Sequence, residues 1–333
     1  MQKKIAILFA NDKNNIDRVW SDETKKELSE LFELTTLYDR QELLSLPFKD
    51  KISYIFSTWG MPSFSVDEVK SFSSLECIFY AAGTVQGFAR EFLQCGVRVF
   101  SAWAANAVPV AEYTVAQIIL ANKGFFGSSI IEKKCNREGA KAHFSTFRGN
   151  YGQKVGLLGA GMIGKLVIKM LKAYKLEVLV FDPFLPDEKA IELGVRKASL
   201  DEIFSECVVV SNHLANNPQT VGILNYSHFS KMAKNGVFIN TGRGAQVVED
   251  DLCRALREEP SRFAVLDVVY PEPSPAGHEF YKLENVILTP HIAGSAGDET
   301  HRMAEYMLEE YKLFASGEQT RYEVTEKMLE TMA

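Results

Sequence analysis

A glycine-rich run, Gly156-Leu157-Leu158-Gly159-Ala160-Gly161-Met162-Ile163-Gly164, lies between two segments of different periodicity. Residues 155–158 are continuously apolar and predict a short buried strand, whereas the residues after the run continue at helical period. Three glycines therefore occupy a strand-to-helix turn. Gly159 permits the tight turn, Gly161 allows a pyrophosphate to approach the backbone, and Gly164 allows the helix to pack on the strand.

The residues beyond this turn indicate which nucleotide it binds. A second apolar segment, residues 177–181, ends in Asp182, and no arginine follows within Pro183-Phe184-Leu185. A carboxylate at this point accepts hydrogen bonds from the adenosine ribose hydroxyls and repels a 2′-phosphate. The exposed N–H groups at the helix start hold the phosphates. We therefore expect NAD as the cofactor in preference to NADP. A nucleotide triphosphatase is disfavoured, because Leu166 stands where a phosphate loop needs Ser or Thr.

Composition and charge limit the partners of the chain. With 333 residues there is room for two domains, and 46% hydrophobic and 24% charged residues are typical of globular proteins. The net charge of −6 offers no basic excess for nucleic acid or an anionic membrane, so neither is expected. The five cysteines are scattered, which favours reduced thiols in a cytoplasmic protein. The apolar run that ends at Ala10 is too short for a signal segment or a membrane span.

Strand and helix patterns alternate along the chain and predict parallel sheets. We expect an amphipathic helix over 17–34, an apolar helix over 106–123, a further helix over 298–314, and no clear element over 124–150. The predicted strands are 4–10, 52–57, 76–82, 97–102, 153–158, 177–182, 207–212, 236–240, 263–267 and 285–288. The pattern predicts two Rossmann/flavodoxin-like, doubly wound α/β domains with a cleft between them. We assign residues 1–104 plus 298–333 to a discontinuous substrate-binding domain and residues 105–297 to the NAD-binding domain.

Three side chains at the ends of late strands form the candidate catalytic group. Arg243 follows the strand 236–240, Glu272 follows the strand that ends in Asp267, and His291 follows the strand 285–288. Ligands of open parallel sheets bind outside the carboxyl ends of the strands. A carboxylate beside an imidazole fixes its tautomer and stabilises its protonated form, and a fixed arginine can hold a substrate carboxylate at two points. The three can therefore support hydride transfer, with His291 donating a proton to a keto oxygen.

Each of these residues alone could be structural, and their shared position favours function. His213 also ends a strand and is expected beside the cofactor. The other four histidines are expected to be surface or structural residues: His143, His228, His278 and His301. No grouping of His, Cys and carboxylates has metal-ligand spacing, so no metal is expected.

The motifs Asn240-Thr241-Gly242-Arg243-Gly244, Leu266-Asp267-Val268, Glu272-Pro273 and Thr289-Pro290-His291-Ile292, with the glycine turn, resemble those of the D-isomer-specific 2-hydroxyacid dehydrogenases. The resemblance implies that Arg243 binds and polarises the substrate, Glu272 supports the histidine, and His291 is the general acid/base. It implies that Asp267 holds the nicotinamide carboxamide. The other implied cofactor contacts are Gly159, Gly161, Met162, Ile163, Gly164, Asp182, His213, Thr241, Gly242, Arg243, His291 and Gly294. The implied substrate contacts, besides Arg243 and His291, are Ala82, Gly83, Thr84 and Trp59. Members are usually homodimers, which gives the segment 107–150 a role in dimerisation.

The chain departs from the family pattern at several positions. Val85-Gln86-Gly87 replaces an acidic residue that is common after the substrate loop, Ala215 stands where proline is common, and Gly242 where Ala or Ser is common. Phosphoglycerate dehydrogenases of the family carry cations after the third strand, whereas residues 57–61 here have none. A phosphate without Arg or Lys is poorly held. We therefore expect a small unphosphorylated 2-oxo acid, such as glyoxylate, hydroxypyruvate or a larger one with an apolar tail.

Three other functions remain open at this point. One is a phosphoglycerate dehydrogenase that lacks the regulatory domain, since the chain leaves no length for that domain. The second is a non-catalytic, NAD-sensing protein that keeps the dehydrogenase fold. The third is a methyltransferase that uses the glycine turn for S-adenosylmethionine, which would leave Arg243, Glu272 and His291 without a task.

Overall fold

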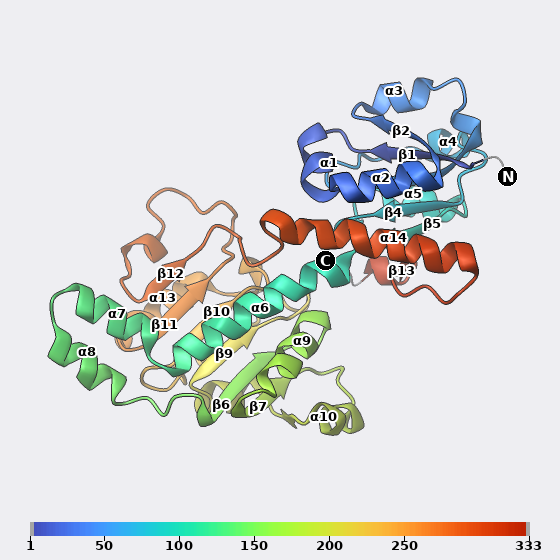
Figure 1. Cartoon of the computed structure of the whole chain (residues 1–333). Helices are drawn as coiled ribbons and strands as arrows, with labels where there is room; N and C mark the ends of the chain where they lie inside the picture. The colour runs from blue at the N-terminus through green and yellow to red at the C-terminus, as the bar shows by residue number, and fades with distance from the viewer. Residues whose placement is uncertain (1–2, 331–333) are drawn as a thin grey trace. The chain divides into compact units, whose positions relative to one another are not determined.

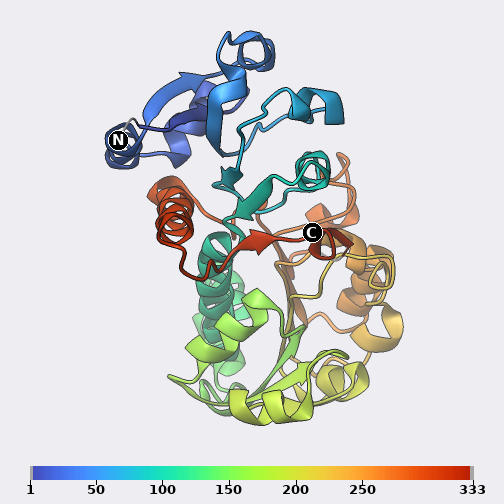
Figure 2. The ribbon, with the colours of Figure 1, turned by 90° about the vertical axis from the view of Figure 1, so that its right-hand side faces the viewer.

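The computed structural model describes residues 3–330, and the chain divides into two compact units (Figure 1). The first unit comprises Met1–Asn106 and Ser295–Ala333, and the second comprises Ala107–Gly294. Each unit contains one sheet of mainly parallel strands with helices on both faces (Figure 2). The predicted fold class, two parallel-sheet α/β domains, is therefore confirmed.

The first unit has a six-stranded sheet in the order β13-β5-β4-β3-β1-β2, in which only β13 runs antiparallel to its neighbour. Its strands are β1 (Ile5–Phe9), β2 (Glu33–Leu37), β3 (Ile52–Ser57), β4 (Cys77–Tyr80), β5 (Arg98–Ser101) and β13 (Glu323–Val324). Its helices are α1 (Lys13–Val19), α2 (Asp22–Leu31), α3 (Arg40–Ser45), α4 (Val66–Lys70), α5 (Ala89–Gln94) and α14 (His301–Ser316), with 3₁₀ turns at Lys49–Lys51, Gly297–Thr300 and Met328–Glu330.

Both faces of this sheet are buried, which explains why its central strands are continuous apolar runs. All six residues of β3 are buried. One face packs against α3, α4 and α5 through Leu43, Val69 and Phe92. The other packs against α1, α2 and α14, and Met303 and Met307 of α14 are fully buried there. The helix near the carboxyl end of the chain thus completes the core of the first unit.

The second unit has a seven-stranded parallel sheet in the order β12-β11-β10-β9-β6-β7-β8. Its strands are β6 (Tyr151–Leu158), β7 (Lys175–Phe181), β8 (Arg196–Lys197), β9 (Val209–Asn212), β10 (Val237–Asn240), β11 (Phe263–Leu266) and β12 (Val286–Leu288). Its helices are α7 (Phe125–Lys133), α8 (Arg137–Phe144), α9 (Met162–Leu171), α10 (Asp187–Leu193), α11 (Leu200–Glu206), α12 (Tyr226–Phe229) and α13 (Glu249–Glu258), with 3₁₀ turns at Gly244–Gln246 and Glu279–Lys282. Helix α6 (Trp103–Asn122) spans the boundary between the two units.

Two hydrophobic clusters cover the two faces of this second sheet. One contains Val167 and Ile168 of α9 together with Ile118 of α6. The other contains Phe204 of α11 and Leu252 of α13. By length and composition α6 could also cross a membrane, but half of its apolar window is buried inside the protein. Core helices pass the same test, so this is weak support for a membrane span.

The sequence prediction missed the two-residue edge strands β8 and β13, and it differs from the structure in three further places. The helix expected over 17–34 is wrong: α1 ends at Val19, and Ser21 begins α2 by accepting a hydrogen bond from the N–H of Thr24. The chain then enters the edge strand β2, which the prediction missed because four of its five residues are exposed or half-buried. Residues 124–150, expected to lack a clear element, contain α7 and α8.

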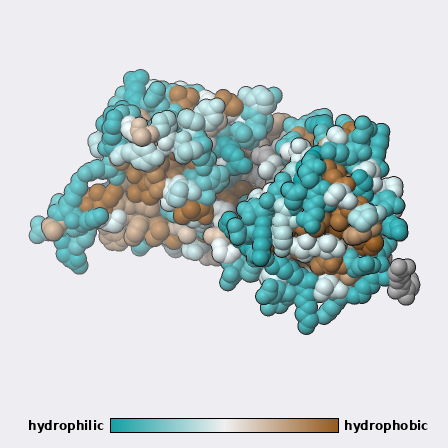
Figure 3. Space-filling model, turned by 90° about the horizontal axis from the view of Figure 1, so that it is seen from above, coloured by the Kyte–Doolittle hydropathy of each residue, from teal (hydrophilic) through white to brown (hydrophobic). Residues whose placement is uncertain are grey.

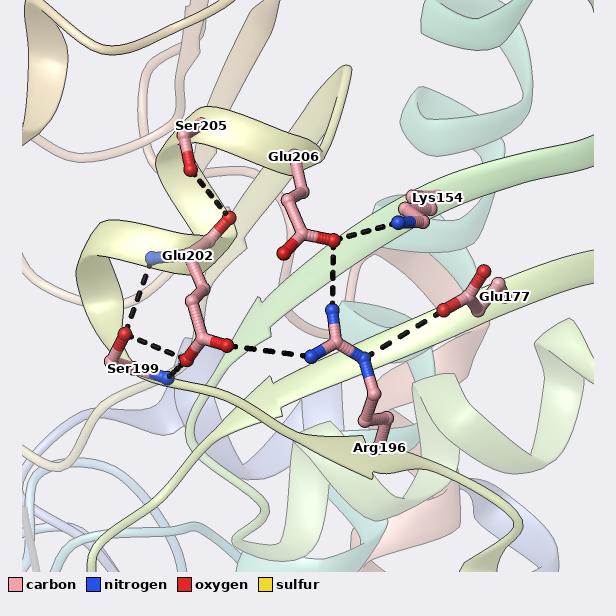
Figure 4. A network of polar contacts seen from close by, with 7 residues as sticks. All are labelled: Lys154, Glu177, Arg196, Ser199, Glu202, Ser205 and Glu206. Atoms are coloured by element: carbon pink, nitrogen blue, oxygen red, sulfur yellow. Dashed lines mark hydrogen bonds and ion pairs between the residues drawn. The ribbon is translucent and has the colours of Figure 1, made fainter.

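An ion-pair network holds the short edge strand β8 to the second sheet (Figure 4). The Arg196 guanidinium lies 2.9 Å from Glu206, 3.5 Å from Glu202 and 3.7 Å from Glu177. Lys154 of β6 reaches the same Glu206 oxygen at 2.6 Å. Because these side chains are 34–49% exposed, solvent screens the pairs and each adds little stability.

Candidate active site

The strand order of the second unit has its switch point at the carboxyl ends of β6 and β9. The chain runs from β6 outward through β7 to β8, and then returns to build β9, β10, β11 and β12 on the other side of β6. Ligands of such sheets bind at this switch point. The glycine turn follows β6 and His213 follows β9, so both lie at the switch point.

The three glycines of the turn meet different surroundings. Gly159 has φ +96°, and a Cβ on it would lie 2.6 Å from the His213 carbonyl oxygen. A Cβ on Gly164 would lie 2.2 Å from the Gly159 carbonyl oxygen, so only glycine lets α9 pack this closely. A Cβ on Gly161 would have no heavy atom within 4 Å. The turn is therefore closed by the first and third glycines and open at the second.

Helix α9 begins directly at the open glycine, with Met162 and Ile163 in its first turn. Its first intrahelical bond runs from the N–H of Lys165 to the Gly161 carbonyl oxygen. The preceding N–H groups have no partner within the helix, and they suit a phosphate. Asp182 lies beside this turn, where its carboxylate accepts from the N–H of Ala160 at 2.7 Å and of Phe184 at 2.9 Å.

Glu272 and His291 are in direct contact. Nδ1 of His291 lies 2.8 Å from Oε1 of Glu272. Because a carboxylate only accepts, the Nδ1–H donates, and Nε2 remains for exchange of a proton with a ligand. Both side chains are partly exposed, at 48% for His291 and 41% for Glu272. The expected carboxylate–imidazole pair is thus formed.

The backbone around His291 is held by Asp267, the buried residue after β11. Oδ1 of Asp267 accepts from the Thr289 hydroxyl at 2.6 Å and from the N–H of Ile292 at 2.8 Å. Oδ2 accepts from the N–H of Ala293 at 2.9 Å. His291 has φ +55°, an uncommon left-handed conformation for a residue with a side chain. Asp267 therefore fixes the loop that carries the histidine, and half-buried Gly294 ends this loop.

Arg243 follows β10, the neighbour of β11, at the same edge of the sheet. Its Nη1 donates to the Gly242 carbonyl oxygen at 2.8 Å, and no hydrogen bond is recorded between its guanidinium and Glu272 or His291. The backbone N–H of Arg243 donates to Oε1 of Gln246. A Cβ on Gly242 would lie 2.9 Å from Gln246 and from Asn212, which explains glycine at this position.

A buried amide network that the sequence analysis missed supports the Arg243 turn. Gln246 is fully buried, and its Nε2 donates to the carbonyl oxygens of Leu214 and Ala215. Asn212 donates to Gln246 at 2.7 Å and to Asn240 at 3.0 Å. The network ties the ends of β9 and β10 together. An Asn at the end of each of these strands was the available signal.

His213 lies in a chain of buried polar side chains. Its Nε2 is 3.0 Å from the Ser211 hydroxyl, and its Nδ1 is 3.4 Å from that of Thr241. The Thr241 hydroxyl lies 3.3 Å from that of Thr114 on α6. Burial lowers the pKa of His213 to about 4, so the imidazole is neutral near pH 7. Because its imidazole is neutral, His213 is better suited to lining the glycine turn than to donating a proton.

The expected substrate residues lie in the first unit, at the carboxyl ends of β3 and β4. The carbonyl oxygens of Ala82 and Gly83 accept hydrogen bonds from the Ser101 hydroxyl. Thr84 is exposed. Val85, which stands where the family often has an acidic residue, is buried in the core. Half-buried Trp59 follows β3. The Arg18 guanidinium lies 5.1 Å from the centre of the Trp59 ring. Sequence analysis missed this cation, because 40 residues separate the two partners along the chain.

These residues fit a dinucleotide. The open space at Gly161, the free helix start and the Asp182 carboxylate suit a pyrophosphate and an adenosine ribose. Among residues 3–330, no group of His, Cys, Asp and Glu side chains has a metal-binding arrangement. The fold and the site together define a dinucleotide-binding α/β protein with a carboxylate–imidazole pair at the edge of its sheet.

Comparison with known proteins identifies the class further. Residues 128–293 match the family model described as the D-isomer specific 2-hydroxyacid dehydrogenase, NAD binding domain. The chain belongs to this family, and the match to an NAD binding domain confirms the expected cofactor NAD.

Two curated relatives and one solved structure illustrate the similarity. The chain is 29% identical over 224 residues to a D-3-phosphoglycerate dehydrogenase of Archaeoglobus fulgidus, covering 67% of this chain and 42% of that protein. It is 33% identical over 168 residues to a glyoxylate reductase of Korarchaeum cryptofilum, covering 50% of this chain and 51% of that protein. The chain thus spans about half the length of these relatives. A phosphoglycerate oxidoreductase from Rhizobium etli shares the fold, with a TM-score of 0.82 at 22% identity over 98% of this chain and 100% of that one.

Proposed function

We propose that the protein is an NAD-dependent oxidoreductase that interconverts a small 2-oxo acid and its D-2-hydroxy acid. The observation that carries this proposal is the 2.8 Å contact between Glu272 and His291 at the carboxyl edge of an NAD-binding sheet. A pure binding protein has no need of a fixed imidazole with a free Nε2 at that edge. The methyltransferase alternative is disfavoured, because the matching family binds NAD.

The residues divide the proposed reaction between them. Met162, Ile163 and Asp182 would hold the dinucleotide, and NADH when bound supplies the hydride for the substrate carbon. Nε2 of His291 gives a proton to the keto oxygen in reduction and takes it back in oxidation. Glu272 keeps the ring in the required tautomer and stabilises its charged form. Arg243 offers a fixed guanidinium to the substrate carboxylate.

For the substrate, we favour an unphosphorylated 2-oxo acid such as glyoxylate or hydroxypyruvate. A phosphorylated substrate is the second candidate, since Arg18 faces Trp59 beside the carboxyl ends of β1 and β3. The chain first builds β1 and β2, and then places β3, β4 and β5 on the other side of β1. The carboxyl ends of β1 and β3 are therefore the switch point of the first sheet. A single exposed arginine is a weaker phosphate site than a cluster.

We also propose a cytoplasmic homodimer. All five cysteines are free, as expected for a reducing compartment. Helices α6, α7 and α8 line a groove of about 560 Å³, with Leu120, Phe125, Ala140 and Phe144 among its walls. Phe125 and Phe144 are 48% and 49% exposed. Figure 3 colours hydrophobic residues brown, and such residues gather in patches on the face of the molecule that it shows. Apolar patches of this kind favour a protein partner, and analytical ultracentrifugation of wild type and Phe125→Asp would test the dimer.

A substrate screen tests the proposed activity. NADH oxidation is followed with glyoxylate, hydroxypyruvate, larger 2-oxo acids and 3-phosphohydroxypyruvate, using wild type, Arg243→Ala and Arg18→Gln. We expect turnover of unphosphorylated acids that falls strongly in Arg243→Ala and hardly changes in Arg18→Gln. Activity confined to the phosphorylated acid and lost in Arg18→Gln would favour the second candidate. NADH binding without turnover of any acid would favour a non-catalytic NAD sensor.

A further inference from the structure

The loop that carries Glu272 has no regular structure of its own. Residues 270–278 form neither helix nor strand, and Tyr270 and Glu272 are exposed. Glu272 must nevertheless be held in place for its carboxylate to meet the His291 imidazole at 2.8 Å. Inside the loop the Ser274 hydroxyl lies 2.7 Å from that of Tyr281, and contacts at the two ends of the loop also bear on the position of this carboxylate.

One side chain outside the loop reaches both of its ends. Glu249, the first residue of α13, is largely buried, with only 12% of its side chain exposed. Its Oε1 accepts from the N–H of Tyr270 at 2.9 Å, at the start of the loop. Its Oε2 lies 3.0 Å from Nε2 of His278, at the end of the loop.

His278 is itself fixed in orientation. Its Nδ1 accepts from the N–H of Phe280 at 3.2 Å, so the ring proton is on Nε2 and donates to Glu249. The ring also packs on Phe280, with centroids 4.8 Å apart, and Phe280 is buried in the core of the second unit. The imidazole thus links the carboxylate of Glu249 to the core.

We propose that Glu249 and His278 are positioning residues, which together clamp the loop 270–278 so that Glu272 stays in contact with His291. This inference rests on the proposed dehydrogenase function. His278 was expected from sequence to be a surface or structural residue, and the clamp gives that structural role a consequence for the active site. A carboxylate displaced by about 1 Å can cost up to about a hundredfold in rate.

Two variants remove the clamp in different ways. Glu249→Gln has nearly the same shape, but one of its two terminal atoms is an NH2 donor, so it cannot accept at both the Oε1 position facing Tyr270 and the Oε2 position facing His278. His278→Phe keeps an aromatic ring against Phe280 and removes both hydrogen bonds. Glu279→Gln is the matched control, because Glu279 is the next residue and pairs with Lys282 and Arg257 on the exposed side. Thermal unfolding and NADH binding verify that each variant is folded.

The decisive measurement is a double-mutant cycle on kcat/KM with Glu272→Gln. We expect each clamp variant to lower kcat/KM by about tenfold or more in the wild-type background, and by less than twofold in the Glu272→Gln background. We expect Glu279→Gln to change it by less than twofold in both. Equal losses in the two backgrounds, or no loss in the wild-type background, would overturn the proposal.

A second readout does not depend on turnover. The ¹⁵N NMR shifts of the His291 ring report whether its Nδ1–H is bound to a carboxylate. We expect the clamp variants to move the His291 signals toward those of Glu272→Gln, while Glu279→Gln leaves them in place. His291 signals that are unchanged in both clamp variants would refute the clamp. A wild-type protein that turns over no 2-oxo acid would refute the proposed function alone, because the NMR comparison would still stand.

Discussion

Nδ1 of His291 and Oε1 of Glu272 lie 2.8 Å apart, although 19 residues separate them and each follows a different strand. Strands β11 and β12 are neighbours and run parallel, so the loops after them leave the same edge of the sheet. In this contact the Nδ1–H of the imidazole donates to Glu272, so Nε2 stays available. The fold therefore leaves one imidazole nitrogen of His291 for exchange of a proton with a ligand.

Replacing this imidazole tests its proposed role. We expect His291→Gln to lower turnover by roughly 10²–10⁴-fold, the usual contribution of a positioned general acid/base. The affinity for NADH should stay near that of wild type, because His291 lies after β12 and the glycine turn after β6. Steady-state kinetics and fluorescence titration with NADH measure the two quantities. His301→Gln, on α14 of the first unit, is the control, and near-normal turnover in His291→Gln would contradict the assignment.

The sequence predicted the parts of the fold that depend on local pattern. The inner strands β9, β10 and β11 of the second sheet are fully buried because both faces are covered, and such largely apolar runs are visible without a structure. Edge strands lack that signal: β2 begins with exposed Glu33, and β13 has only two residues. The split between α1 and α2 depends on the cap at Ser21, which the longer helical pattern obscured.

The candidate site likewise has residues that the sequence predicted and residues that it did not. The ends of parallel strands share an edge by rule, so Arg243, Glu272 and His291 could be grouped from sequence. The roles of Gln246 and Glu249 depend on contacts with residues up to about 30 positions away, and no local pattern marks a buried amide or carboxylate. Arg18 meets Trp59 only because α1 packs beside the end of β3, which is a tertiary contact.

The glycine turn offers a matched pair of substitutions. We expect Gly164→Ala to destabilise the protein by about 1–3 kcal/mol, because its Cβ would lie 2.2 Å from the Gly159 carbonyl oxygen. We expect Gly161→Ala to leave stability unchanged, because its φ of −68° suits alanine and the space around the Cβ is open. Its methyl group would instead occupy the path of the pyrophosphate and weaken NADH binding by about tenfold, or 1.4 kcal/mol.

Thermal unfolding without nucleotide and titration with NADH separate these two effects. A Gly161→Ala variant that binds NADH as tightly as wild type would show that the phosphates do not approach at this position. A Gly164→Ala variant with wild-type stability would show that α9 can move away from the turn without cost.

Asp182 is expected to set the preference for NAD over NADP. Its carboxylate is held by the N–H groups of Ala160 and Phe184, so its charge stays beside the turn. We expect Asp182→Ala to lower the ratio of NADPH to NADH dissociation constants by about tenfold or more, because the repulsion of a 2′-phosphate is lost. Asp187→Ala is the control, since Asp187 pairs with Lys197 at the surface. An unchanged ratio in Asp182→Ala would show that another residue selects the cofactor.

His213 makes the stability of the protein depend on pH. Burial lowers the pKa of this imidazole from 6.5 to about 4, so between these values the unfolded chain binds a proton that the folded chain refuses. Stability must therefore fall as the pH decreases below about 6.5, and the loss is complete near pH 4. From pH 7 to pH 5 we expect His213 to account for about 2 kcal/mol of lost stability. Urea denaturation at the two pH values, without nucleotide, measures the loss in wild type and in His213→Gln.

Two other histidines act in the same direction and must be separated from His213. Burial also lowers the pKa of His143 and His228, so some loss of stability at pH 5 should persist in His213→Gln. His228→Gln is the matched control, since its ring lies on α12 and contacts Asn225 rather than the Ser211–Thr241 chain. We expect the pH 7 to pH 5 difference to shrink more in His213→Gln than in His228→Gln. If His213→Gln loses as much stability as wild type over this range, His213 is protonated in the folded protein and the buried chain tolerates its charge.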